Sequence, residues 1–233
     1  MSQPGGHDRP LVAIVPARAG SKGLPGKNRR DLAGTPLYRR AVDQGLAAGA
    51  REVLVSTDDP VILGAEHGPG VTVVERPVEL SGDEVPMAPV LVDVLDRAGV
   101  DDADVVLLQP TSPLRDVADI RACSELLRTT GCDLVMSVCR ADAGVLKYGV
   151  ADGDRFVPMR SAEHTFANRQ MLPPVFRPNG AVYVFDASWL RRHRSLVTDS
   201  IAMYEMDEAR SIDIDVLADF ERCEQLLETE RGR

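Results

Sequence analysis

LVAIVPARAGSKGLPGKN, residues 11–28, is the part of the sequence that decides the fold. Its first five residues are apolar and end at Pro16, a pattern typical of a buried strand. The loop that follows contains three glycines, which let a backbone approach a ligand closely, and the cations Arg18, Lys22 and Lys27. The segment therefore predicts a first strand that runs into a phosphate-binding loop.

This loop differs from the two common glycine-rich phosphate motifs. Five residues separate Gly20 from Gly26, and Asn28 stands where a P-loop needs Ser or Thr. The GxGxxG pattern of dinucleotide-binding proteins is also missing from the segment. A solvated basic loop is the alternative, but ligands of open α/β sheets bind beyond the carboxyl ends of strands, which favours a phosphate site.

Short apolar runs alternate with amphipathic segments along the rest of the chain. The predicted strands are residues 11–15, 53–55, 71–74, 105–108, 133–138, 181–185 and 211–215, and the predicted helices are 36–48, 60–66, 89–98, 119–127 and 216–227. The alternation predicts one α/β domain, residues 1–233, with a mainly parallel sheet flanked by helices on both faces. Residues 140–178 are polar and irregular, and we expect an active-site flap or a subunit contact there.

Composition excludes several classes of protein. The net charge of −9 argues against a general nucleic-acid-binding surface, which needs a broad basic stripe. No apolar run reaches the length of a membrane span, and the N-terminus lacks the apolar stretch of a secretory signal, so we expect a cytoplasmic protein. The four cysteines lack zinc-like spacing, and we expect them to be reduced core thiols.

Two aspartates near the C-terminus form the second chemical feature. In the segment SIDID, residues 211–215, strand alternation would point Asp213 and Asp215 to the same side. Two carboxylates on one face can hold a hard cation, and Mg²⁺ is the natural choice beside a nucleoside triphosphate. The alternative is that Asp215 caps the helix that follows.

A third feature is LLQPTSPLR, residues 107–115, where a buried strand runs into a polar loop. Its residues Gln109, Thr111, Ser112 and Arg115 are well placed to hydrogen-bond a sugar, although Pro-Thr-Ser-Pro also makes an ordinary turn.

The fourth feature is RQMLPPVFRPNGAVYV, residues 169–184, which leads back into a strand with Arg169, Arg177 and Asn179 expected to be exposed. Arginine forks match carboxylates and phosphates, so an acidic substrate would suit them, and surface ion pairing is the alternative. We expect Phe185, Trp189 and Phe220 to lie in the core.

Taken in order, PARAGSKGLPGKN, VSTDD, RPVEL, LLQPTSPLR and SIDID resemble the acylneuraminate cytidylyltransferases, also called CMP-sialic acid synthetases. The resemblance covers about residues 12–227 and implies a Rossmann-like nucleotidyltransferase fold. It implies transfer of CMP from CTP to the anomeric hydroxyl of a nonulosonic acid, with release of pyrophosphate and with Mg²⁺ as cofactor. It also implies a homodimer in which residues 140–178 form the contact and complete the partner's sugar site.

The resemblance gives roles to individual residues. The CTP phosphates and nucleoside would be bound by Arg18, Ser21, Lys22, Lys27, Asn28 and Arg76. The acidic sugar would be bound by Gln109, Lys147 and Arg169, with Arg177 and Asn179 beside them. Asp213 and Asp215 would hold Mg²⁺ and, with Lys22 and Arg169, make up the catalytic set. The proton acceptor is either a metal-bound water or one of the aspartates.

The sequence departs from the family pattern at two places. Val85 and Met87 stand where the family usually has small hydroxyl residues after the aspartate that matches Asp83, so a contact with CTP is altered there. Phe166 precedes Arg169 where some relatives carry an acidic residue, which bears on the sugar's side groups.

Other substrates and activities remain open from the sequence. One group of alternatives is a cytidylyltransferase for legionaminic acid, a deaminated sialic acid, Kdo or a phosphonate. A glycosyltransferase that uses a nucleotide sugar also carries an Asp-x-Asp motif, but here the pair lies near the C-terminus. A nucleotide-binding regulator without turnover is disfavoured because both the cationic loop and the aspartate pair are present.

Overall fold

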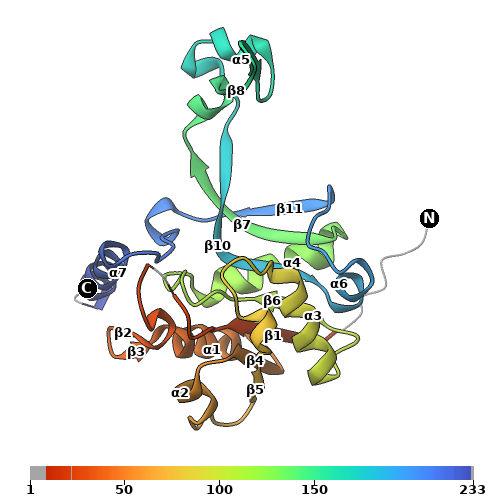
Figure 1. Ribbon diagram of the computed structural model, residues 1–233, viewed down its shortest axis with the longest axis vertical. Coiled ribbons are helices and arrows are strands. Elements are labelled where there is room, and N and C mark those ends of the chain that lie inside the picture. Colours follow the sequence, from red (N-terminus) through yellow and green to blue (C-terminus); the bar gives the residue numbers. More distant parts are fainter. Residues whose placement is uncertain (1–8, 22, 232–233) are drawn as a thin grey trace.

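The computed structural model describes residues 9–21 and 23–231, so Lys22, a predicted nucleotide-binding and catalytic residue, lies outside the described residues. Its centre is a seven-stranded sheet (Figure 1). In spatial order the strands are β11 (Ile201–Glu205), β7 (Leu134–Ala141), β10 (Val175–Asp186), β6 (Asp104–Leu107), β1 (Leu11–Pro16), β4 (Glu52–Thr57) and β5 (Val71–Glu75). Strand β10 runs antiparallel to both of its neighbours, and the other pairs are parallel. The predicted mainly parallel sheet is confirmed.

Helices cover both faces of this sheet. On one face α1 (Leu37–Ala48) and α4 (Val117–Thr130) pack on side chains of β1, β4 and β10. On the other face lie α3 (Met87–Ala98) and α6 (Ala187–His193). Residues of β1 alternate between the two apolar clusters, which explains why its sequence is continuously apolar. Phe185 and Trp189 are buried in the second cluster, as predicted.

A third apolar cluster closes the edge next to the glycine loop. There α7 (Leu217–Arg231) packs with its buried Phe220 against the short hairpin of β2 (Asp31–Leu32) and β3 (Thr35–Pro36). The remaining short helix, α2 (Pro60–Leu63), follows β4 and is capped by Asp59. Within the described residues, no helix is long and apolar enough to cross a membrane.

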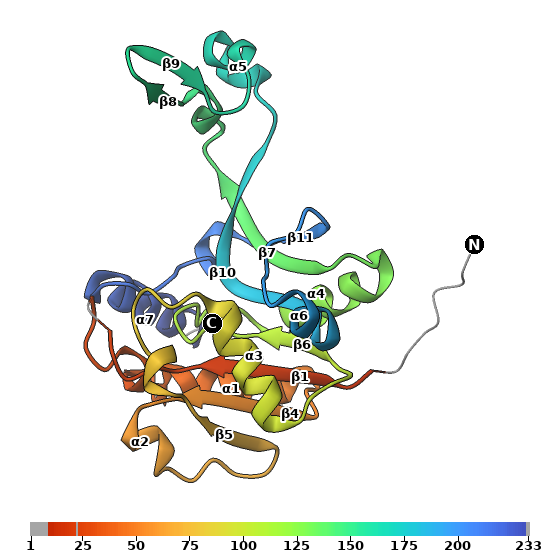
Figure 2. The ribbon, with the colours of Figure 1, turned by 45° about the vertical axis from the view of Figure 1, so that its right-hand side comes forward.

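Residues 142–174 form an arm between β7 and β10. It contains the hairpin β8 (Gly149–Asp152) and β9 (Arg155–Pro158), the helix α5 (Ala162–Phe166), and the 3-10 turns η3 (Ala143–Lys147) and η4 (Arg169–Met171). Figures 1 and 2 show the arm at the far end of the β7–β10 ribbon, projecting away from the sheet and its helices. The stretch predicted to be irregular is therefore a short hairpin and turns on a two-stranded stalk.

Several expectations about the C-terminal half are wrong. Residues 211–215 form no strand, because the Ile214 amide donates to the Thr111 carbonyl of a loop rather than to a neighbouring strand. Strand β11 and helix α6 were not predicted, and β10 begins six residues before the predicted strand at 181. Cys132 is partly exposed, whereas the other three cysteines are buried thiols as expected.

We predict that Gly45→Val lowers the free energy of unfolding by about 1–3 kcal/mol because α1 touches the sheet there. A Cβ on Gly45 would stand 3.0 Å from Ala13 Cβ and 3.3 Å from Val53 Cγ2. The matched control is Ala47→Val on the exposed side of the same helix, which should cost about 0.5 kcal/mol through helix propensity. Chemical denaturation of both variants measures the difference, and equal losses would contradict this packing.

Candidate active site

A cleft of about 240 Å³ opens beyond the carboxyl ends of β1, β5 and β6. Its walls come from five separate parts of the chain and include most of the predicted nucleotide-binding residues. It is lined by Pro16, Arg18, Gly20, Ser21, Lys27, Asn28, Arg76, Met87, Gln109, Pro110, Thr111, Asp213 and Asp215. The sheet thus brings the predicted phosphate loop, sugar loop and aspartate pair to one site, as parallel sheets do with the loops at their carboxyl edge.

The start of the glycine loop is fixed by its neighbours in the sheet. The Ala19 amide donates to Asp58 Oδ1 at 2.7 Å, and Thr57 Oγ1 donates to the Ala17 carbonyl at 2.6 Å. At the other end, Asn28 Nδ2 donates to the Arg18 carbonyl at 2.9 Å, which closes the loop on itself. The two ends of the loop are therefore held in place before a ligand arrives.

The glycine loop also lies directly on the aspartate segment. Lys27 Nζ donates to the Ile214 carbonyl and, at 3.2 Å, to Asp215 Oδ1. Gly23 approaches so closely that a Cβ there would stand 2.4 Å from the Asp215 carbonyl oxygen. Glycine is needed at this position because any side chain would push the two segments apart.

The aspartates keep the arrangement expected of a strand although they are not in one. Ile214 is buried in the third apolar cluster, and the flanking Asp213 and Asp215 are exposed toward the cleft. The helix α7 that follows is capped by Asp219, whose Oδ2 accepts from the amides of Asp215 and Val216 at 3.0 Å. The Asp215 carboxylate, which the alternative interpretation assigned to capping, accepts from Lys27 instead.

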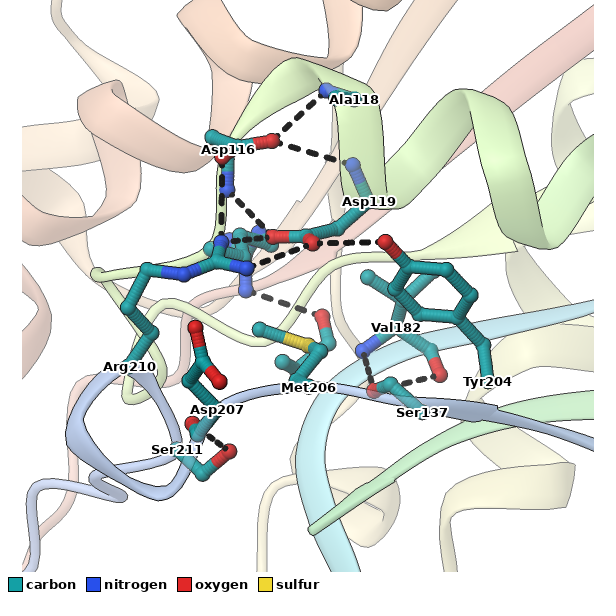
Figure 3. A network of polar contacts seen from close by, with 12 residues as sticks. Asp116, Ala118, Asp119, Ser137, Val182, Tyr204, Met206, Asp207, Arg210 and Ser211 are labelled. Atoms are coloured by element: carbon teal, nitrogen blue, oxygen red, sulfur yellow. Dashed lines mark hydrogen bonds and ion pairs between the residues drawn. The ribbon is translucent and has the colours of Figure 1, made fainter.

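An ion-pair network anchors the residues just before the aspartates (Figure 3). Arg210, at the end of η5 (Glu208–Arg210), reaches the start of α4 and pairs with Asp116 and Asp119. Asp119 is only 1% exposed and also accepts from Tyr204 Oη at 3.3 Å. Hydrogen bonding to Asp119 raises the pKa of Arg210, so this pair stays charged and holds the segment in place.

The aspartate pair is chemically suited to a divalent cation. Burial by the cleft walls raises the pKa of Asp213, although its side chain is open to the cleft. Repulsion by the Asp215 carboxylate raises this pKa further. A hydrogen bond with Thr111 and the positive charge of Lys27 lower it. A cation between the two carboxylates would remove the repulsion and favour both charged forms. Among the described residues, no three or more His, Cys, Asp and Glu side chains are placed so that they could hold a metal ion together, so phosphate oxygens and water would have to complete the coordination shell of a cation at the two aspartates.

Two arginines border the nucleotide side of the cleft. Arg76 is buried and donates from Nε to Ser56 Oγ at 3.1 Å and from Nη2 to the Ser56 carbonyl at 3.0 Å. Burial lowers the pKa of its guanidinium, a cost that an anionic ligand would offset. Arg18 forms an ion pair with Asp83. Met87 lines the cleft at the start of α3, where the family resemblance led us to expect an altered contact with CTP.

The predicted sugar-binding residues lie in three places: in the cleft, on the arm and its stalk, and in the protein interior. Gln109 and Thr111 line the cleft. Lys147 and Arg169 lie on the arm, and exposed Arg177 lies on its stalk, so the cleft of the same chain is not lined by any of the three. Arg169 pairs with Asp142 in the arm.

The prediction that Asn179 is exposed is wrong, because it is 2% exposed and its amide is used inside the protein. It accepts from Ser137 Oγ at 2.6 Å and donates to Ser211 Oγ at 2.9 Å. Ser112 and Arg115, expected to face a sugar, are buried as well. Asn179 therefore positions the backbone that leads to the aspartates.

A family model for cytidylyltransferases matches residues 12–230, nearly the whole described chain. The chain belongs to the cytidylyltransferase family. The predicted family is thus confirmed.

Among curated cytidylyltransferases, the N-acylneuraminate cytidylyltransferase of Streptococcus agalactiae is 33% identical over 213 residues, or 90% of this chain and 51% of the relative. The chain spans about half the length of that relative. The CMP-N,N'-diacetyllegionaminic acid synthase of Legionella pneumophila is 30% identical, with 94% of this chain and 96% of the relative covered. The 3-deoxy-manno-octulosonate cytidylyltransferase of Methylococcus capsulatus is 32% identical, with 93% and 96% covered.

A solved structure supports the fold. CMP:2-keto-3-deoxy-manno-octonic acid synthetase complexed with CTP superposes with a TM-score of 0.69, covering 95% of this chain and 99% of that one at 19% identity. The predicted Rossmann-like nucleotidyltransferase fold is confirmed.

Gly180 lies close to this cleft, and the sequence analysis did not single it out. Its φ of +76° lies in the left-handed region, at the irregularity of β10 between Pro178 and Tyr183. A Cβ there would stand 3.2 Å from Ser112 Oγ, 3.5 Å from Gln109 Oε1 and 3.8 Å from Asp213 Oδ2. The Asn-Gly pair is the signal that could have revealed it, since Asn-Gly is typical of left-handed backbone.

We predict that Gly180→Ala weakens Mg²⁺ binding in the presence of CTP by about tenfold, because the methyl group crowds Ser112 Oγ and its strained backbone shifts the contacts with Gln109 and Asp213. The matched control is Gly68→Ala, with φ +79° and nothing within 4 Å of its Cβ. Both variants should lose about 1 kcal/mol of unfolding free energy from backbone strain. Calorimetric titration compares them, and an equal loss of affinity in both would contradict this role of Gly180.

Proposed function

We propose that the protein transfers CMP from CTP to the anomeric hydroxyl of a nonulosonic acid of the sialic type, with Mg²⁺ as cofactor, in the cytoplasm. The observation that carries this proposal is the cationic glycine loop held against Asp213 and Asp215 in one cleft. Relatives of this family are named for sialic, legionaminic and 3-deoxy-manno-octulosonic acids, which makes an acidic sugar the substrate class.

The proposed reaction is the one that the family resemblance implies, and the charges in the cleft suit it. The anomeric oxygen forms a bond to the α-phosphorus of CTP, the bond from that phosphorus to the bridging oxygen breaks, and pyrophosphate leaves as the hydroxyl loses its proton. Arg18 and Lys27 bind and orient the phosphates, and Lys22 is assigned the same task by its place in the loop. When bound by Asp213 and Asp215, Mg²⁺ would neutralise charge on the phosphates. Positioning and charge neutralisation dominate such displacements.

The choice of a nonulosonic acid over Kdo rests on sequence. SKGLPGKN and QPTSPLR are both present, and we do not expect both in the Kdo branch. Phe166 on the arm, 89% exposed, is the position at which the preferred acid would be set, whereas Met87 in the cleft bears on the contact with CTP. A nucleotide-sugar glycosyltransferase is disfavoured because the family match covers residues 12–230.

We further propose a homodimer in which each arm completes the partner's sugar site. The arm carries the exposed apolar side chains of Tyr148, Val150, Phe156, Met159, Phe166 and Met171. Large exposed apolar side chains gathered on one short arm favour a protein contact there, since a segment this short buries little apolar surface by itself. The arm also carries the cations Lys147 and Arg169 away from their own cleft. Docking two arms would bury the apolar side chains and bring these cations to an acidic sugar.

We predict that purified protein with CTP and Mg²⁺ releases pyrophosphate with at least one acid of a nonulosonic panel, and that Asp213→Asn lowers the rate about 100-fold or more. Asp199→Asn, an exposed carboxylate outside the cleft, is the control and should leave the rate unchanged. A coupled pyrophosphate assay with product analysis measures both. The proposal would be contradicted if no acid gave a CMP-linked product, or if Asp213→Asn and Asp199→Asn had equal rates.

Mixing two inactive variants tests the shared site. In a heterodimer of Asp213→Ala and Arg169→Ala chains, the intact cleft of one chain meets the intact arm of the other. We therefore expect about one quarter of the wild-type rate after unfolding and refolding an equal mixture, since about half of the dimers are mixed and each has one complete site. Refolded single variants should stay inactive. A mixture no more active than its components would show that the cleft works with its own arm or with none.

A further inference from the structure

A second cavity, of about 180 Å³, lies behind the polar loop of residues 109–115. It sits between α1, the start of α4 and the C-terminal half of α7, and it shares no lining residue with the active-site cleft. Its walls include Arg40, Gln44, Arg115, Arg210, Leu226 and Leu227. The proposed reaction uses none of these side chains.

Arg115 is the unusual group of this cavity. It is 2% exposed, and Nη1 donates to the carbonyls of Gln109 at 2.7 Å, Ser112 at 2.9 Å and Ala181 at 3.0 Å. Its Nε and Nη2 are buried and have no hydrogen-bond partner among the described residues. One edge of the guanidinium is therefore fully used, while the other edge, with Nε and Nη2 side by side, is left without protein acceptors.

The charge of Arg115 is also poorly compensated. Burial lowers the pKa of its guanidinium to about 9, and only the field of Asp119 opposes this. That carboxylate is already paired with Arg210. A buried cation without its own counter-ion is costly, so the site gains free energy from any anion that can reach it.

The other walls select the kind of anion. Among the described lining residues, Asp116 is the one carboxylate, and it is paired with Arg210, so it is not a counter-ion of Arg115. Gln44 Nε2 donates to the Arg115 carbonyl at 2.6 Å. Its Oε1 is buried, has no hydrogen-bond partner within the part of the chain that the structure describes, and could accept a hydrogen bond from a ligand hydroxyl. The free Nε–Nη2 edge of a guanidinium matches two oxygens of one carboxylate or phosphate.

We propose that this cavity binds a small oxyanion, a carboxylate or a phosphate, on the free edge of Arg115. Because the other edge of the same guanidinium holds the carbonyls of Gln109 and Ser112, occupancy adjusts the loop that presents Gln109 to the cleft. The binding site is independent of the proposed function, whereas its effect on turnover rests on that function.

Direct binding separates this site from the phosphate loop. We would titrate orthophosphate and, separately, acetate into the full protein without nucleotide or metal, using calorimetry and ³¹P NMR, in wild type, Leu226→Trp, Arg115→Met and Lys27→Met. Leu226→Trp fills the cavity without touching the buried arginine's hydrogen bonds, so it remains informative if Arg115→Met fails to fold. We expect Leu226→Trp to weaken binding of one of the two anions at least tenfold, while its affinity for CTP stays within twofold of wild type. Lys27→Met should leave the affinity for that anion unchanged.

The two probes distinguish a carboxylate ligand from a phosphate ligand. Unchanged binding of both anions in Leu226→Trp, or crystals soaked in each anion that show only water beside Arg115 Nη2, would overturn the proposal. For the coupled effect, the bound anion should change KM for the acidic substrate at saturating CTP in wild type and not in Leu226→Trp. An equal effect of the anion on KM in wild type and in Leu226→Trp would show that the cavity is not coupled to the cleft. If the protein shows no turnover, the binding titrations alone test whether the cavity binds an anion.

Discussion

The contact between the glycine loop and the aspartate segment is the constraint on which the site depends. Lys27 and Ile214, joined by a hydrogen bond, are 187 residues apart in the sequence. Gly23 permits the close approach, and Lys27 holds it by a backbone hydrogen bond and an ion pair with Asp215. The opposite charges of Lys27 and Asp215 are thus placed together before any ligand binds. When a triphosphate binds with its cation, Lys27 would bind the phosphates and the aspartates the cation, with little rearrangement of the protein.

The rest of the fold brings these two segments together and keeps them there. Strand β1 delivers the glycine loop to the carboxyl edge of the sheet, and the Asp58 carboxylate after β4 fixes its start. The aspartate segment has no strand partner among the described residues, so it is held by the buried Ile214 side chain and by Asn179 through Ser211. Arg210 of η5 adds a third anchor by its ion pair with Asp119 of α4 (Figure 3). Loss of any one anchor would be expected to loosen both carboxylates, because they share one short backbone.

Much of this could be predicted from sequence because the signals are local. The buried parallel strands are apolar on both faces, as residues 11–15 show, and the loop after them combines glycines with cations in one short segment. Strand β11 was missed because it is an edge strand in which Ile201, Met203 and Glu205 are exposed, so its sequence lacks a continuous apolar run. Helix α6 is too short to show a helical period.

The errors about the site have a common cause, since they depend on contacts between distant residues. Alternation correctly placed Asp213 and Asp215 on one side but could not show that Thr111 replaces a neighbouring strand. Asn179 looked like an exposed ligand because its partners Ser137 and Ser211 lie far away in sequence. The arm's direction, which removes Lys147 and Arg169 from their own cleft, is likewise a property of the whole β7–β10 ribbon.

The central claim is that the two aspartates and the glycine loop together hold one divalent cation and a triphosphate. The most direct measurement is a crystal structure with CTP and Mn²⁺, in which anomalous scattering locates the metal. The account predicts an anomalous peak within coordination distance of Asp213 and Asp215 and of a phosphate oxygen, with the phosphates against Lys27. A triphosphate seated elsewhere, or a metal held away from both aspartates, would contradict it.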